Sequence, residues 1–104
     1  MTISDLQKAI DATYGARDRK RGIERSFLWL VEEVGELAEA IRHGTQEEVK
    51  HEVGDVLAWL VSVANTAGVD VEEASRRFAE SCPYCHHVPC SCRSEDTSKL
   101  KKSP

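Results

Sequence analysis

The chain has 104 residues, of which 40% are hydrophobic and 31% are charged, and its formal net charge is −4. That length suffices for one domain but not for two, and the acidic balance argues against a membrane surface and against a stable nucleic-acid partner. Neither a signal-peptide core nor a run of transmembrane length occurs, so we expect a cytoplasmic protein with no membrane partner.

The first quarter of the chain is predicted to form a short helix followed by a loop. Residues 3–14 place apolar side chains three and four positions apart, and Ser4 with Gln7 fits a capping box. Residues 15–25, GARDRKRGIER, are basic and contain two glycines, which is typical of a loop.

Two long helices are predicted next, over about residues 24–43 and 45–67. Gly44 ends the first, Thr45 with Glu48 can cap the second, and Gly68 ends it. The apolar stripes expected to face the core are Phe27, Leu30, Val31, Val34, Leu37, Ala38 and Ile41 on one helix and Val49, Val53, Val56, Leu57, Leu60, Val61 and Ala64 on the other.

A short fourth helix is predicted over about residues 70–81, and no strand or hairpin signal occurs. We therefore predict an all-α fold, an antiparallel four-helix bundle, because a tight turn between long helices favours antiparallel packing. The predicted organisation is a helical domain over 1–81, a cysteine-rich loop over 82–92 and a disordered polar tail over 93–104.

Each long helix carries two acids three residues apart, one turn from a tryptophan. At about 100° per residue, each set lies on one side of its helix, beside the apolar stripe. Antiparallel packing would bring the carboxylates together, and they would repel one another unless a hard cation such as Mg²⁺ or Mn²⁺ were bound. A solvated acidic face is the alternative. The two sets are Trp29, Glu33 and Glu36 on the first helix and Glu52, Asp55 and Trp59 on the second.

These acids resemble the motifs of the MazG-like all-α nucleotide pyrophosphohydrolases. EEVGE at residues 32–36 matches the E-E-x-x-E motif of that family, and EVGD at residues 52–55 matches its E-x-x-D motif. The likeness extends from about Leu6 to Ala79. The paired motif is specific, whereas either half alone is a weak signal.

The resemblance implies an enzyme that hydrolyses nucleoside triphosphates, NTP or dNTP, to nucleoside monophosphate and pyrophosphate. It implies a Mg²⁺-dependent attack of water on the α-phosphorus, and a homodimer or homotetramer. The implied metal ligands are Glu33, Glu36, Glu52 and Asp55, and Glu32 would lie behind them or orient the water.

Cationic and aromatic residues outside the motifs are candidates for substrate binding. The basic loop can hold the triphosphate or be a solvated turn. The tryptophans can stack on a base, but they can also fill the core or a subunit interface. The substrate-binding candidates are Arg17, Arg21, Lys50, Trp29, Trp59 and Asn65, and Arg19, Lys20 and Arg25 are further basic residues of the loop.

All the cysteines lie in CPYCHHVPCSC, and they are Cys82, Cys85, Cys90 and Cys92. The first two have the spacing of a zinc knuckle, and four thiolates can bind one tetrahedral Zn²⁺. His86 or His87 can replace one cysteine as a ligand. Disulfides, unligated thiols and another metal are the alternatives.

A different class of function is a non-catalytic helical adaptor, stapled by zinc, whose acids only solvate its surface. A di-iron carboxylate bundle would need two E-x-x-H motifs, and only Glu48-x-x-His51 occurs. The sequence leaves open the preferred base and sugar and the choice between nucleotide-pool housekeeping and removal of damaged nucleotides.

Overall fold

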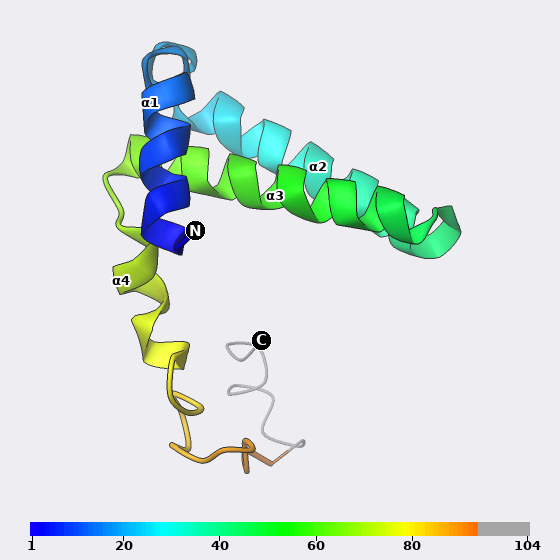
Figure 1. Ribbon diagram of the computed structural model, residues 1–104, viewed down its shortest axis with the longest axis vertical. Coiled ribbons are helices and arrows are strands. Elements are labelled where there is room, and N and C mark those ends of the chain that lie inside the picture. Colours follow the sequence, from blue (N-terminus) through cyan, green and yellow to red (C-terminus); the bar gives the residue numbers. More distant parts are fainter. Residues whose placement is uncertain (94–104) are drawn as a thin grey trace. The chain divides into compact units, whose positions relative to one another are not determined.

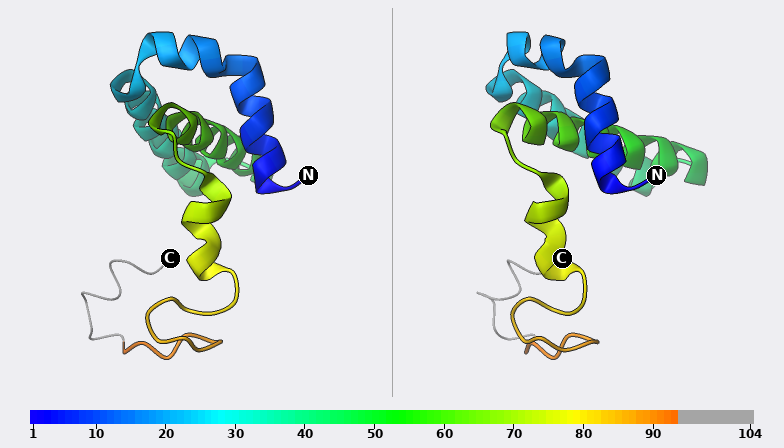
Figure 2. Two further views of the ribbon diagram at one scale, coloured as in Figure 1. Left: turned by 90° about the vertical axis from the view of Figure 1, so that its left-hand side faces the viewer. Right: turned by 60° about the vertical axis from the view of Figure 1, so that its left-hand side comes forward.

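The computed structural model describes residues 1–93, which are all-α with no strand, as predicted. The helices are α1 (Ile3–Arg21), α2 (Ile23–His43), α3 (Gln46–Ala67) and α4 (Val71–Ser75), and a 3₁₀ turn follows over Arg76–Phe78. α2 and α3 lie side by side and antiparallel (Figure 1). α1 crosses this pair (Figure 2). Apart from Arg93, the predicted tail lies outside the described residues.

The described residues form two compact units, which divide between Val71 and Glu72. The first holds α1, α2 and α3. The second begins within α4 and holds the cysteine-rich loop.

The first helix is longer than predicted, and the predicted loop over residues 15–25 is wrong. Gly15 lies inside α1, and the helix ends at Gly22. The φ of 92° at Gly22 is one that glycine adopts readily and residues with a side chain rarely adopt. Three basic residues occupy the last turn, where positive charge complements the helix dipole. The predicted Ser4–Gln7 capping box is also wrong, because Thr2 and Asp5 form the box through two contacts of 3.0 Å.

The boundaries of the two long helices agree with the prediction because local signals set them. The Thr45 hydroxyl accepts the Glu48 amide at 3.2 Å, and Gly68 ends α3 in the left-handed conformation. The fourth helix is shorter than predicted, because α4 ends at Ser75 and only the 3₁₀ turn continues it.

The apolar core is much smaller than predicted. Its buried hydrophobic residues are Leu30, Ala40, Val61 and Ala64. Of the stripe predicted for α2, only Leu30 is buried. α2 and α3 pack against each other along one narrow seam, and their apolar stripes are wider than that seam. Large apolar side chains that stay exposed on α2 and α3 include Phe27, Leu28, Val31, Val34, Ile41, Val53, Leu57 and Leu60.

Candidate functional site

The α2–α3 hairpin brings the two predicted acidic motifs together. Carboxylate oxygens of Glu33, Glu36 and Glu52 lie within 4.8 Å of one another. Asp55 belongs to a second such group with Glu52 and His51, also within 4.8 Å. The four predicted ligands, Glu33, Glu36, Glu52 and Asp55, therefore form two groups that share Glu52, and we call these four residues the acidic cluster.

The electrostatics of the acidic cluster fit a divalent cation. Burial, then the negative charge of Glu36, raises the pKa of Glu33 to about 7, and Glu52 and Asp55 act in the same direction. The Oε2 atoms of Glu33 and Glu52 are buried without a hydrogen-bond partner. A hard cation would ligate both oxygens and neutralise the repulsion, so the oxygen donors present fit Mg²⁺ or Mn²⁺.

Two further residues, Glu32 and His51, lie next to members of the acidic cluster but are not part of it. Glu32 is exposed and is in neither group of ligand atoms. His51, which sequence reasoning did not select, places Nε2 at 3.2 Å from Oδ2 of Asp55. The i,i+4 spacing of His51 and Asp55 on one helix was the signal available for this contact.

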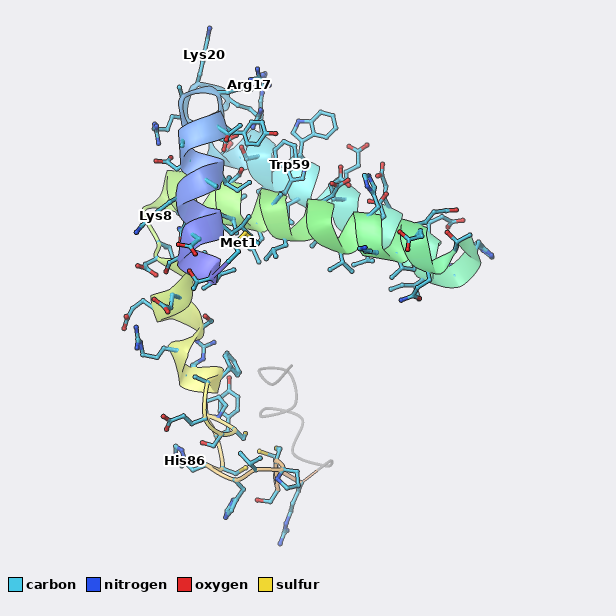
Figure 3. The ribbon with its side chains drawn as sticks, viewed as in Figure 1. Met1, Lys8, Arg17, Lys20, Trp59 and His86 are labelled. Atoms are coloured by element: carbon cyan, nitrogen blue, oxygen red, sulfur yellow. The ribbon has the colours of Figure 1, made fainter. Side chains whose placement is uncertain are left out.

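An aromatic and basic cleft lies between α1 and α3. The rings of Trp29 and Trp59 are stacked, with their centroids 6.1 Å apart and their planes inclined by 20°. The Arg21 guanidinium carbon lies 5.1 Å from the centroid of the Trp59 ring. A cavity of about 250 Å³ opens here, and its polar and aromatic lining includes Tyr14, Arg17, Asp18, Arg21, Asp55 and Trp59. Arg17 and Trp59 are labelled in Figure 3.

Asp18 is a buried acidic residue in this cleft that sequence reasoning missed. Its side chain is almost fully buried, and Oδ1 accepts a hydrogen bond from Arg21 Nη1 at 2.8 Å. The same Nη1 lies 3.3 Å from the hydroxyl of buried Ser26, which fixes the guanidinium over Trp59. Oδ2 of Asp18 is buried without a hydrogen-bond partner. The prediction of a loop over this segment hid the i,i+3 pair.

The other substrate-binding candidates lie elsewhere. Lys50 is exposed and does not line the cleft. Asn65 is engaged at both ends of its side chain, because Oδ1 accepts from Gln7 Nε2 at 3.0 Å and Nδ2 donates to the Gln7 carbonyl at 3.2 Å. Asn65 therefore joins α3 to α1 outside the cleft. The remaining basic candidates, Arg19, Lys20 and Arg25, are exposed.

Comparison with protein families agrees with the motifs. The model of the MazG nucleotide pyrophosphohydrolase domain matches residues 21–84, which is more than half of the chain. The chain belongs to the MazG nucleotide pyrophosphohydrolase family. The matched segment contains α2, α3 and the whole acidic cluster, and members of this family typically use a divalent metal. A search of curated proteins finds no significant match.

Within the described residues of this MazG protein, no helix has both the length and the apolar character needed to cross a membrane.

The cysteine-rich loop of this MazG protein continues past the end of the family match at residue 84. All four cysteines are free thiols, and their Sγ atoms lie within 4.8 Å of one another, so they could bind a metal. The Ser91 and His87 amides donate to Cys85 and lower its pKa to about 4. Contact with Cys90, then burial, raises the pKa of Cys92 to about 12. The neighbouring sulfur atoms thus oppose the ionisation of Cys92, and a bound cation would relieve that opposition.

Proposed function

We propose that this protein hydrolyses nucleoside triphosphates to nucleoside monophosphate and pyrophosphate in a metal-dependent reaction. One observation carries the proposal. Two antiparallel helices bring four carboxyl groups close together, and the buried Oε2 atoms of Glu33 and Glu52 have no hydrogen-bond partner. Carboxylates left unpartnered in this way are costly for a fold unless they bind a cation. Membership of the MazG family supports the same reaction class.

The acidic cluster would hold Mg²⁺, with Mn²⁺ as the second choice of ion. When bound, the ion supplies positive charge to the phosphoryl oxygens and polarises a water for attack on the α-phosphorus. Glu33 must release its proton to act as a ligand, and its raised pKa makes that release favourable only near neutral pH and above. Glu32 is exposed beside the cluster, and we assign it the orientation of the attacking water.

The cleft beside the acidic cluster would receive the nucleotide. Asp55 belongs to the acidic cluster and also lines the cleft, so a molecule in the cleft reaches the metal ligands directly. Arg17 and Arg21 would bind phosphate oxygens, since guanidinium groups match their geometry. Trp59 and its stacked partner Trp29 would pack against the base. Lys50 and Asn65 receive weaker support, because neither residue lines the cleft.

The protein would act as a homodimer or homotetramer in the cytoplasm. The apolar side chains of α2 and α3 are too exposed for a stable monomer, and Leu28 and Ile41 are examples, with exposed fractions of 66% and 65%. A second copy, with its own exposed α2 and α3, would cover this face. The cytoplasmic location stays a prediction from the sequence.

The experiment that tests the proposal is a product assay. The purified protein is incubated with canonical and modified NTPs and dNTPs, with Mg²⁺ or with EDTA, and the phosphates are resolved. We expect monophosphate and pyrophosphate, which disappear with EDTA and in the variant Glu36→Gln. Glu39→Gln is the matched control, because Glu39 lies one turn later on α2 and outside both ligand groups.

The absence of turnover across the panel, with helicity intact, would contradict the proposal. The paired motif would then be a scaffold, and the non-catalytic adaptor would replace the enzyme. Inorganic phosphate as the product would also contradict it, since the attack would then fall on another phosphorus. The ranking of substrates by kcat/KM would identify the preferred base and sugar.

A further inference from the structure

The loop that carries Cys82, Cys85, Cys90 and Cys92 forms a site that the pyrophosphohydrolase reaction does not use. We propose that these four thiolates bind one Zn²⁺ in a closed tetrahedral site that folds the loop. This inference is independent of the proposed function, because it concerns the unit that begins at Glu72 and not the acidic cluster.

The spacing of the sulfur atoms is that of ligands around one ion. Sγ of Cys82 lies 3.8 Å from Sγ of Cys92, and Sγ of Cys85 lies 3.9 Å from Sγ of Cys90. With zinc–sulfur bonds of about 2.3 Å, the edge of a tetrahedron is about 3.8 Å. A disulfide would need about 2.05 Å, so the sulfur atoms are not paired with one another.

Backbone amides point at the sulfur atoms, as expected for thiolate ligands. The Ser91 amide donates to Cys85 Sγ at 3.3 Å, and the Cys92 amide donates to Cys90 Sγ at 3.4 Å. Such bonds hold the sulfur atoms in place and stabilise their negative charge.

The chain folds tightly around the first pair of cysteines. The His86 amide donates to the Cys82 carbonyl at 2.8 Å, and the Cys82 amide donates to the His87 carbonyl at 3.3 Å. His86 adopts a φ of 62°, which is unusual for a residue with a side chain. His86 lies in this loop (Figure 3). This reversal returns the chain towards Cys90 and Cys92, so that all four sulfur atoms meet.

The donor set selects zinc in a structural role. Four thiolates leave no open coordination position, which is the mark of a structural zinc site and not of a catalytic one. Soft sulfur donors disfavour Mg²⁺ and Mn²⁺, the ions that fit the acidic cluster. A histidine ligand is not needed, because Nδ1 of His87 contacts the Ser91 hydroxyl at 2.8 Å, and the group of ligand atoms contains only cysteines.

The loop needs the metal because it has no apolar core. Among residues 72–93 none is buried, and the buried residues of the described chain all lie in the first unit. Short segments of this kind depend on a metal or on disulfides for order, and the cysteines here are free. The free energy of zinc binding would therefore be the folding free energy of the loop.

The test is the metal content and the ligand chemistry of the whole chain. The protein is purified without chelator and its zinc is quantified by elemental analysis. We expect one zinc per chain in the parent protein and almost none in the variants Cys85→Ser and Cys90→Ser. Replacement of zinc by Co²⁺ should give the sulfur-to-metal charge-transfer bands of tetrahedral thiolate coordination, and these bands separate the loop from the carboxylates of the acidic cluster.

Two control variants keep the result interpretable. His87→Ala should retain zinc, and loss of zinc in His87→Ala with retention in one cysteine variant would overturn the four-thiolate site. Glu52→Gln should also retain zinc, because Glu52 belongs to the acidic cluster. The circular dichroism spectrum of the whole protein, to which α1, α2 and α3 contribute most of the helical signal, is compared across all variants. Loss of zinc is then not confused with unfolding of the helices.

Three further outcomes would overturn the proposal. The first is a parent protein that binds no zinc even when Zn²⁺ is added under reducing conditions. The second is a mass that lacks the hydrogens of the thiols, which would show disulfides. The third is iron as the bound metal.

Discussion

The acidic cluster and the cysteine-rich loop differ in what holds their side chains in place. The four carboxylates lie on helices of 21 and 22 residues, whose backbone hydrogen bonds and packing fix the side chains before any cation arrives. The four cysteines lie in a segment, residues 82–92, that has no helix, no strand and no buried residue. The fold thus builds the acidic cluster, whereas under our zinc proposal the metal would build the cysteine-rich loop. We therefore expect the first site to keep its structure without a metal and the second to lose its structure without zinc.

The strongest test of this contrast is a pair of substitutions. Glu52→Gln removes the residue shared by both ligand groups, and we expect kcat/KM to fall by more than about 10²-fold because the metal is lost or misplaced. The helices should stay folded in circular dichroism. Cys90→Ser should show the reverse pattern, with kcat/KM retained and rapid proteolysis within residues 82–92. A large loss of activity in Cys90→Ser with the helices intact would mean that the two sites are coupled.

The exposed apolar face offers a second way to sharpen the comparison. The helical unit would be stabilised by another copy of itself, whereas the loop would be stabilised by a metal. Val31 is 50% exposed on α2, and full burial of a valine is worth roughly 1.5–3 kcal/mol. Val31→Lys should therefore weaken assembly by about tenfold or more. Analytical ultracentrifugation measures this change, and Val69→Lys is the control at a valine of similar exposure outside the two helices. Equal effects of the two variants would place the interface elsewhere.

The cleft between α1 and α3 allows a third test, because the fold positions its side chains before any substrate binds. Arg21 is held by Asp18 and Ser26 before any substrate is bound. Arg21→Ala should raise KM by about tenfold or more, since a hydrogen bond to a charged group is worth roughly 1.5–3 kcal/mol. The matched variant is Arg19→Ala, whose guanidinium pairs instead with exposed Asp11 at 3.0 Å. Steady-state kinetics compares them, and a larger effect from Arg19→Ala would reassign the phosphate-binding residue.

The smallest expected effect is the pH dependence of stability without metal. The pKa of Glu33 is about 7 in the folded protein and 4.5 in its ordinary environment, so the folded state holds this proton more tightly. The free energy of unfolding should therefore decrease as the pH rises through this interval. Urea unfolding in EDTA measures the slope, which Glu33→Gln should reduce and Glu32→Gln, at an exposed neighbour, should not. Added Mg²⁺ should stabilise the protein more at pH 8 than at about pH 5, because protons compete for the same carboxylate.

The boundaries of the long helices follow from local signals, and so they could be read from the sequence. Thr45 and Gly68 each act within one turn of the chain, through a cap and a left-handed conformation. Gly15 is also a glycine and so carries the same sequence signal for a helix end, but it lies inside α1. The difference is the positive φ at Gly22, which depends on where the chain turns towards α2 and is not visible in the residue type.

The sequence by itself determined which residues are the candidates for the chemistry. The spacing of Glu33 and Glu36, of Glu52 and Asp55, and of the cysteines is set by the geometry of one helix or one short loop, which needs few distant contacts. Only the tertiary structure decided what surrounds these residues: the buried oxygens of Glu33 and Glu52, the burial of Asp18 in the cleft, and the exposed apolar face. Burial depends on side chains from several helices, because the energy of a polar group is set by what lies around it and not by its place in the chain.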